Sequence, residues 1–497
     1  MNRMFKYELL DTIPSLAWLM KITKNEEVLV KHGKMVERRD RFFVSGVWDG
    51  NFEEGDFVSA KFSCCSGGII DNNGDVVITT PSHLQEAVFS LSLTNYLIIS
   101  NSLPFLLSEV KMRLDENYYQ YEADFCSVVF GEKDAAKFIP LLNDYRLRLH
   151  RNCNMRIADY RRIEEVSKGV DDRFNNYDEY CDFLHGVLQR IKDNASDGKR
   201  KFCYGMISTI SQGYDATAVS ALAADLGCKE VITLRTPAND NGKGIALKLG
   251  YTNVHEIERD AFEKNEILLE AEAAATGQVG GMIFEAYENF CSGKLIFMGT
   301  RGDSIWEKKR IGVNEELAFP YNGYAQASLS PTEHLFRINS IIIHVPLIGA
   351  DKWPDIAQIS NSDEMKPWSV GGEYDRPIAR RLVEEKGVLR EEFGTIKLGA
   401  GVSFHFNTLT SLKRKMSPTS YKSLIAYKAQ NKSNTIKSLL FKVNFVLSEF
   451  PVFFNYLMSK NKIRFFIDER MCGHKSSPVG NLMILWGVNE MTKRYKL

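Results

Sequence analysis

Residues 206–236, MISTISQGYDATAVSALAADLGCKEVITLRT, place a short polar loop between two segments of different hydrophobic pattern. The first segment is an apolar, β-branched run, and the second is an alanine-rich run with helical spacing. The run EVITLRT then returns to strand character. A strand, a helix and a second strand in this order predict a parallel sheet with right-handed crossover connections.

The same alternation extends to both sides of this stretch. KFCYGMISTI (201–210) is a predicted strand, GKGIALKLG (242–250) a helix, and NVHEIE (253–258) a strand. GKLIFMGTRGD (293–303) is a further strand that enters a glycine turn. Because a parallel sheet binds its ligands at the carboxyl ends of its strands, we predict an α/β fold here with its site in the loops that follow the strands.

The front of the chain has a different pattern. In GGIIDNNGDVVITT (67–80), two β-branched runs flank the residues of a tight hairpin turn. NYLIISNSLPFLLSE (95–109) indicates a strand that enters a helix started by Pro104. These features predict a β-rich α+β domain. From residue 124 to residue 197 the pattern predicts mainly helix, and we expect the domain boundary near residues 158–172.

Length and composition are those of an ordinary globular chain. The 497 residues exceed what one hydrophobic core usually holds, so about two to four domains are expected. The 63 basic and 63 acidic side chains cancel, so the net charge gives no general attraction to nucleic acid or to an anionic membrane. Nine cysteines without a CxxC pair predict a location in the reducing cytoplasm.

Two segments bear on membrane targeting. The amino terminus lacks an uninterrupted apolar core and a small-residue cleavage site, so no signal peptide is expected. Residues 438–458 are the most apolar late stretch, but Lys442, Glu449 and Pro451 interrupt it. We expect one or two helices with a wide apolar face there rather than a membrane span. A helix that binds an interface or a partner is the alternative.

The polar loop at residues 211–217 has the features of an anion site. Between a strand end and a helix start, its backbone N–H groups point outward with the positive end of the helix dipole behind them. Gly213 allows close approach to a phosphate, and Ser211 and Thr217 supply hydroxyls. Asp215 supplies a carboxylate for a divalent ion. The alternative is a capped strand-to-helix turn that binds nothing.

A second loop repeats the combination of glycine and carboxylate. In IFMGTRGDSIWEKKR (296–310), an apolar strand ends at Gly299 and leads through Gly302 to Asp303. If the two strands are neighbours, Asp215 and Asp303 are placed to share one Mg²⁺ ion that bridges the phosphates of a nucleotide. Gly-Asp turns are common on surfaces, so the pairing of the two loops carries this prediction rather than either loop alone.

These residues resemble a known family. ISQGYDAT (210–217) is similar to the SGGxDS pyrophosphate loop of the PP-loop ATP pyrophosphatases. The order of the later segments, over roughly residues 180–410, resembles the synthetase domain of the asparagine synthetase and β-lactam synthetase group. In this resemblance EVITLRT, with Leu234, matches the strand under the adenine. MGTRGDSIWEK, with Gly299 and Gly302, stands in the place of SGEGADELFGGY.

The resemblance implies three domains. It implies a parallel-sheet synthetase domain of the adenine nucleotide alpha hydrolase type at residues 166–410. A β-rich, glutaminase-like α+β domain of the N-terminal nucleophile (Ntn) type precedes it at residues 1–165. A helical extension, residues 411–497, is expected to pack on the synthetase domain. Asn2 stands where such glutaminases expose a cysteine nucleophile, so the first domain is expected to lack glutaminase activity.

The implied chemistry is ATP-dependent amide formation. A substrate carboxylate attacks the α-phosphorus of ATP, pyrophosphate leaves, and a nitrogen nucleophile captures the acyl-adenylate. ATP and Mg²⁺ are the implied cofactors, with Asp215 and Asp303 on the metal. Lys397, in a glycine-rich run similar to the family's lysine segment, would neutralise the acyl-adenylate, and a solvated surface lysine is the alternative. The residues implied around the nucleotide are Ser211, Gln212, Gly213, Tyr214, Asp215, Thr217, Leu234, Gly299 and Gly302.

The implied partners are small molecules. The substrate would be a small-molecule or sugar carboxylate, and the amine would come from free ammonia, an ammonia-supplying partner or the substrate itself. No nucleic-acid partner is expected, and a homodimer remains an option. Gln212, Ala216 and Thr300 depart from the family pattern. Two alternatives therefore stay open: a PP-loop ATP pyrophosphatase of another modification pathway, and a non-catalytic nucleotide-binding scaffold.

Other polar residues carry weaker signals. The arginines of YDRPIARRL (374–382) either grip an acceptor carboxylate or phosphate or form the exposed face of a helix, which is the expected case. His255 and His344 lie in strand-like runs and are expected to be structural, because no HxxxH or Cys/His spacing indicates zinc. Trp486 lies in an apolar run that predicts a core or docking helix.

Overall fold

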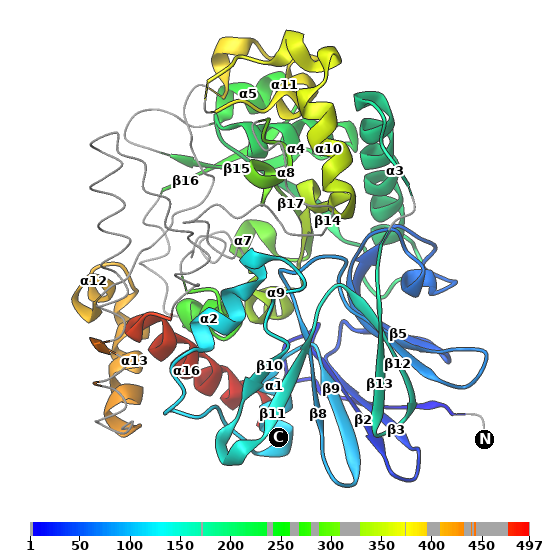
Figure 1. The fold of residues 1–497 in the computed structure, drawn as a ribbon, viewed down its shortest axis with the longest axis vertical. Coiled ribbons are helices and arrows are strands. Elements are labelled where there is room, and N and C mark those ends of the chain that lie inside the picture. Colours follow the sequence, from blue (N-terminus) through cyan, green and yellow to red (C-terminus); the bar gives the residue numbers. More distant parts are fainter. Residues whose placement is uncertain are drawn as a thin grey trace.

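A computed structural model gives the fold (Figure 1). The first third of the chain forms two β-rich sheets, and a later part forms an all-parallel sheet with helices. This mixed α/β architecture confirms the coarse fold prediction. The residues that the structure describes are 3–169, 172–235, 242–258, 268–279, 288–308, 329–372, 374–394, 408–431, 439, 442–443 and 476–496.

The front of the chain contains a larger and a smaller sheet. Apart from the parallel β1–β3 pair, the neighbouring strands in both sheets are antiparallel. In the part of the chain that the structure describes, the larger sheet has the order β1 (Phe5–Leu9), β3 (Val28–His32), β2 (Trp18–Thr23), β9 (Tyr96–Ser100), β8 (Val88–Ser92), β11 (Arg146–His150) and β10 (Phe138–Pro140). The smaller has the order β13 (Arg162–Ser167), β12 (Cys153–Asp159), β7 (Val76–Thr79), β6 (Ser63–Ile70), β5 (Phe42–Trp48) and β4 (Glu37–Arg38).

These two sheets share one apolar core. Trp18 and Ile99 from the larger sheet cluster with Phe43, Ile78 and Met155 from the smaller one, all fully buried. The Phe43 ring meets the Trp18 ring edge-on, with 5.1 Å between ring centroids. Burial of large aromatic side chains supplies much of the stability of such a core.

The predicted hairpin and strand-to-helix turn are both confirmed. β6 and β7 pair antiparallel across the turn, where Gly74 has a φ of 84° and the Asp71 carboxylate accepts the N–H groups of Asn73 and Asp75. β9 leads into α1 (Leu103–Val110), which has a proline in its first turn. The Ser102 hydroxyl caps this helix by accepting the Phe105 N–H.

The predicted helical character of residues 124–197 is correct at the two ends of this range, and it begins with α2 (Tyr121–Cys126) and the 3₁₀ helix Ser127–Phe130. β10, β11, β12 and β13 occupy most of residues 138–167. β13 lies at a sheet edge and its residues are exposed or half-buried, so its sequence lacks the apolar alternation that marks a strand. The helix then follows as α3 (Tyr177–Ala195), which Asn176 caps by accepting the Glu179 N–H.

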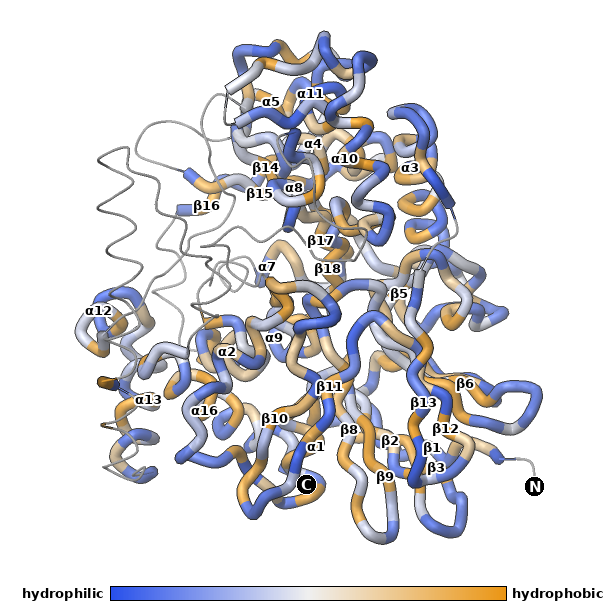
Figure 2. Tube along the Cα trace, in the orientation of Figure 1, coloured by the Kyte–Doolittle hydropathy of each residue, from blue (hydrophilic) through white to orange (hydrophobic). Residues whose placement is uncertain are grey.

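The third sheet contains the opening stretch of the sequence. Among the described residues its order is β16 (Asn253–Glu258), β15 (Glu230–Arg235), β14 (Gly205–Ile210), β17 (Lys294–Met298) and β18 (Ile341–His344), and every neighbouring pair is parallel. Apolar residues follow β17 and β18 through the middle of the molecule (Figure 2). α4 (Tyr214–Asp225) packs against β14 and β17, and α11 (Pro377–Glu384) packs on α4.

Helices from the end of the chain contact both parts of the molecule. α16 (Pro478–Thr492) packs on α6 (Leu269–Ala274) and also on α1 and α2 (Tyr121–Cys126) of the β-rich part (Figure 1). The buried Trp486 indole donates to the Ser423 hydroxyl at 3.0 Å. Within the described residues, α16 therefore contacts the β-rich part of the molecule as well as α6.

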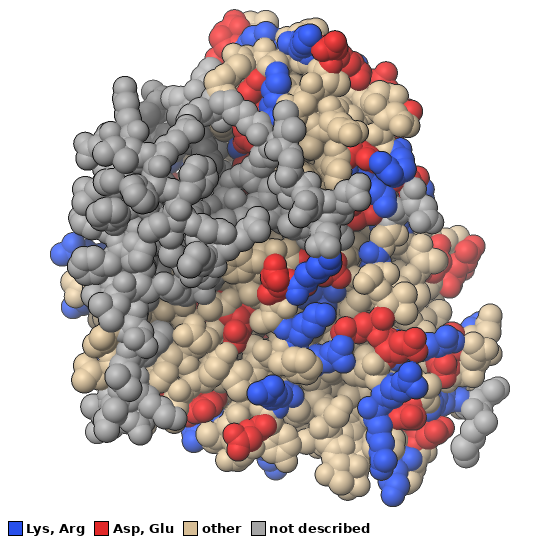
Figure 3. Space-filling view, in the orientation of Figure 1, with Lys and Arg blue, Asp and Glu red and all other residues tan. Residues whose placement is uncertain are grey.

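None of the helices in the described ranges has both the length and the apolar character that a membrane span needs. The predicted helices at 438–458 lie almost wholly outside the described residues. On the face in Figure 3, basic and acidic side chains of the described residues are interspersed.

Phe43→Ala tests the shared core of the two front sheets. Since Phe43 is fully buried, its truncation is expected to lower the free energy of unfolding by about 3–5 kcal/mol. Phe138→Ala is the matched control, because that ring is 48% exposed. Urea unfolding of both variants measures the difference, and equal effects would contradict the assigned core.

Candidate active site

The loop after β14 lies where a doubly wound sheet binds its ligands. From β14 the chain runs outward in one direction through β15 to β16, and then in the other direction through β17 to β18. The connections therefore reverse between β14 and β17, and the carboxyl ends of these strands form the switch-point crevice of the sheet. Both predicted glycine-carboxylate loops follow these two strands.

The first loop leads directly into α4. Gly213 is the N-cap, and no side chain caps the helix. The Gly213 N–H donates to the Ser211 hydroxyl at 3.2 Å, and the Gly394 N–H donates to the Gln212 carbonyl at 2.7 Å. Ser211 and Gln212 are half-buried. The positive end of the α4 dipole thus lies at the crevice, as an anion site requires.

Two of the predicted ligand residues have side chains directed into the protein. Thr217 is fully buried, and its hydroxyl lies 2.6 Å from the carbonyl oxygens of both Ser211 and Gly213. This hydroxyl therefore closes the loop on itself, and its contact with a pyrophosphate stays a prediction. The Tyr214 ring is also fully buried, and its hydroxyl accepts a hydrogen bond from Arg380. The Tyr214 side chain therefore belongs to the core.

The second loop packs directly against Asp215. A Cβ atom added at Gly302 would lie 2.5 Å from the Cγ of Asp215, and one at Gly299 would lie 2.6 Å from the Asp215 carbonyl carbon. Any side chain would clash at both positions, so the close approach requires glycine. Asp303 follows in the first turn of α8 (Gly302–Ile305). The structure thus brings the two predicted loops into contact.

Arg376 adds a positive charge to this crevice. Its Nη1 donates to Oδ2 of Asp215 at 2.5 Å, and its Nε lies 3.6 Å from Oε2 of Glu307. The Arg376 side chain is only 3% exposed, so the expected exposed helix face is wrong for this residue. No local pattern could have indicated this pair, because 161 positions separate the partners.

A second arginine joins α11 to the first loop. Arg380, the next turn along from Arg376, is 2% exposed and bonds to the Tyr214 hydroxyl. Its guanidinium carbon lies 4.9 Å from the centroid of the Tyr214 ring, and that of Arg376 lies 4.9 Å from the centroid of the Tyr374 ring. Cation–π contacts of this kind strengthen when they are withdrawn from water. α11 is therefore anchored to the start of α4 by buried arginines.

The charges around Asp215 bear on metal binding. Burial raises the pKa of Asp215 to about 6; Arg376 opposes this rise and the charge of Asp303 adds to it. Oδ1 of Asp215 is buried without a hydrogen-bond partner among the described residues. Carboxylate oxygens are the ligands that Mg²⁺ prefers. The unpartnered Oδ1 of Asp215 is thus an available carboxylate oxygen next to the second loop, and a Mg²⁺ ion held by Asp215 and Asp303 stays a prediction.

Two further residues are predicted to belong to the site, Leu234 and Lys397. Leu234, the second-last residue of β15, is 7% exposed and pairs with Ile257 of β16. The segment that carries Lys397 lies outside the described residues, so its role stays a prediction.

No protein-family model matches this chain, and no curated protein matches it significantly.

Gly302→Ala tests the contact between the two loops. The added methyl group would meet the Asp215 carboxylate, so we expect a loss of about 1–3 kcal/mol in the free energy of unfolding. Gly244→Ala is the control, since nothing lies within 4 Å of a Cβ there and the residue is helical; it should be neutral or stabilise by about 0.5–1 kcal/mol. Thermal unfolding distinguishes the two, and a neutral Gly302→Ala would contradict the contact.

Asp215→Asn tests the raised pKa of this carboxyl group. The folded protein holds the proton up to a pKa of about 6, whereas the ordinary pKa is 3.8. Between these pH values the folded state binds more protons than the unfolded state, so this group lowers the free energy of unfolding as the pH rises from about 4 to about 6. The variant should therefore gain stability relative to wild type across this window and keep a constant difference above it.

Urea unfolding of both proteins at several pH values from about 4 to about 8 measures this difference. Asp215→Asn also removes the ion pair with Arg376, which shifts the free energy of unfolding at every pH. The slope of this free energy against pH is therefore the quantity that tests the raised pKa. Parallel curves would contradict the raised pKa.

Proposed function

We propose that the switch-point crevice binds ATP with Mg²⁺ and that the protein is an ATP-dependent, amide-forming ligase. The observation that carries the proposal is the packing of Gly299 and Gly302 against Asp215, which joins two glycine-carboxylate loops at one ligand-binding position of the sheet. The similarity of these loops to the asparagine synthetase and β-lactam synthetase group supports it.

The first loop would bind the pyrophosphate part of ATP. Backbone N–H groups at the start of a helix bind phosphate without any charged side chain, because the helix dipole and the free donors act together. Gly213 keeps this approach open, and Ser211 offers a hydroxyl that is half-exposed. The hydrogen bonds of the Thr217 hydroxyl hold the loop in the shape that such binding needs.

Asp215 and Asp303 would hold Mg²⁺, which would neutralise the charge of the departing pyrophosphate. The Arg376 guanidinium is buried and contacts the Asp215 carboxylate. It is therefore placed to contact a phosphate or a carboxylate that enters the crevice. Binding of the metal then requires Arg376 to share or release the Asp215 oxygen that it contacts.

The reaction that the resemblance implies has two steps. A carboxylate of a small molecule or a sugar acid attacks the α-phosphorus of ATP and displaces pyrophosphate, which forms an acyl-adenylate. An amine then attacks the acyl carbon and AMP leaves. Fixed charges and donors supply most of the catalysis in such steps because negative charge develops on the phosphate and acyl oxygens. Lys397 would neutralise the acyl-adenylate.

One alternative has support from the same site. A nucleotide-binding scaffold would keep the anion site without turnover, and the ion pair between Arg376 and Asp215 favours it because a guanidinium already neutralises the predicted metal ligand. A PP-loop enzyme of another modification pathway would hydrolyse ATP to AMP and pyrophosphate without a carboxylate substrate. Binding and turnover measurements separate the three.

Asp215→Asn is expected to weaken binding of Mg²⁺-ATP by at least about tenfold, which is about 1.4 kcal/mol. Calorimetry with wild type, Asp215→Asn and Asp303→Asn measures the loss. Asp225→Asn is the control, because Asp225 is exposed at the opposite end of the same helix. Pyrophosphate release that depends on an added carboxylate would support the ligase.

Binding without any pyrophosphate release would favour the scaffold, and release without a carboxylate would favour the other PP-loop pathway. If folded wild-type protein does not bind Mg²⁺-ATP, or if Asp215→Asn binds as tightly as Asp225→Asn, the proposed function is wrong.

A further inference from the structure

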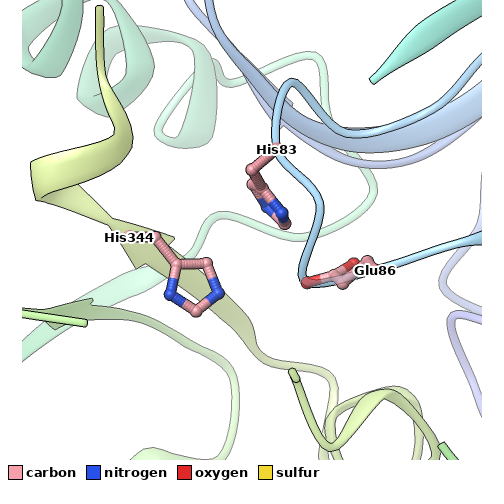
Figure 4. Close-up of side chains that lie close together, drawn as sticks. All are labelled: His83, Glu86 and His344. Carbon is pink, nitrogen blue, oxygen red and sulfur yellow. The ribbon is translucent and has the colours of Figure 1, made fainter. Parts of the chain in front are cut away.

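Two histidines and a glutamate converge at the junction of the β-rich part and the parallel sheet (Figure 4). His83 and Glu86 come from the loop between β7 and β8, and His344 is the last residue of β18. One nitrogen of each ring and one oxygen of the carboxylate all lie within 4.8 Å of one another. The arrangement brings together residues more than 250 positions apart in the sequence, which is why no spacing indicated it.

The histidines of this cluster are buried with unpaired nitrogens. His83 and His344 are each 2% exposed. Neither ring nitrogen of His83 has a hydrogen-bond partner among the described residues, and neither does Nδ1 of His344. A buried polar atom without a partner costs about 1–3 kcal/mol. The two buried nitrogens of the His83 ring therefore lack the hydrogen bonds that would normally stabilise them.

Ser330 joins the other two groups. Its hydroxyl lies 2.9 Å from Nε2 of His344 and also bonds to the Glu86 side chain. Burial raises the pKa of Glu86 to about 7. The Glu86 carboxylate would thus be stabilised by a cation at the cluster, because that charge would replace the proton that burial favours.

Burial keeps the two imidazoles neutral. It is the largest cause that lowers the pKa of His83, with smaller contributions from the neighbouring His344 and Lys168, and burial followed by the charge of Arg301 lowers the pKa of His344 to about 3. A neutral imidazole retains the lone pair that coordinates a metal. The same environment therefore disfavours protons on the rings and leaves their lone pairs available.

A second cluster in the described residues contains a histidine whose two ring nitrogens both have hydrogen-bond partners. His150, Cys153 and Glu165 also gather within 4.8 Å. There the His150 Nδ1 bonds to Glu165 and its Nε2 lies 2.7 Å from the Ser90 hydroxyl, so both ring nitrogens have partners. That cluster is a closed hydrogen-bond network, and the unpaired His83 ring distinguishes the first cluster from it.

We propose that His83, Glu86 and His344 form a binding site for a divalent transition-metal ion, with Zn²⁺ the best match. Two imidazoles and one carboxylate are the protein ligands of many zinc sites that keep a further position open. A cavity of about 30 Å³, large enough for a water molecule, borders His83 on a side that neither Glu86 nor His344 lines. The ion would link the front loop to the edge strand of the parallel sheet.

Metal analysis of the purified protein tests this site. After dialysis against Zn²⁺ and then against a weak chelator, wild type should retain about one equivalent of zinc by mass spectrometry. His83→Gln and His344→Gln should each lose more than about 100-fold in affinity, since even outer-shell changes cost 10–100-fold. His255→Gln is the matched control, because His255 is a histidine of the same sheet that already pairs with Glu230 at 3.1 Å.

A spectroscopic titration covers the case in which a variant does not fold. Co²⁺ added to wild type should give visible bands of nitrogen and oxygen coordination that stoichiometric Zn²⁺ removes. Circular dichroism reports the folding of each variant. The proposal is wrong if wild type retains no metal, or if folded His83→Gln and His344→Gln bind as His255→Gln does. ATP is absent from these measurements, so their outcome is independent of the proposed ligase activity.

Discussion

The structure around the crevice depends on one close contact, the approach of the loop after β17 to Asp215. Gly299 and Gly302 permit it, because a Cβ at either residue would fall within 2.6 Å of Asp215 atoms. The contact lies at the carboxyl ends of β14 and β17, where the sheet reverses its winding. Every other feature of the candidate site is arranged around this carboxylate.

Arg376 balances the charge that this contact buries. A desolvated carboxylate is costly unless a cation or a proton accompanies it, and here a guanidinium does so while burial keeps the pKa of Asp215 near 6. The arginine is held by its place just before α11, and α11 is in turn tied to α4 through Arg380 and Tyr214. A charged ligand would compete for Arg376 or for Asp215, so its binding would change the ion pair between them.

The junction between the two parts of the molecule contains a different kind of polar cluster. In the crevice, the charged groups of Asp215 and Arg376 contact each other. At the junction, the His83 ring is instead buried among apolar and cationic neighbours and makes no hydrogen bond with a described residue. Both sites lie at carboxyl ends of parallel strands, the first between β14 and β17 and the second at β18. Functional side chains are often found at strand ends, because the loops there do not take part in the hydrogen bonds of the sheet.

The sequence by itself determined the local elements. The alternation of apolar runs and glycine turns predicted the parallel sheet, the hairpin of β6 and β7 and the helix α3, because periodicity and turn chemistry act over a few residues. It also marked Asp215 and Asp303 as carboxylates at strand ends. It missed β13, whose polar edge position leaves no alternation to detect.

Only the tertiary structure decided which groups meet. The pairing of Arg376 with Asp215 and the convergence of His83 with His344 both depend on strand order and packing. These contacts join residues that no local pattern relates. Hydrophobic periodicity specifies which face of an element is buried, but the partner of a buried charge is set by the assembled fold.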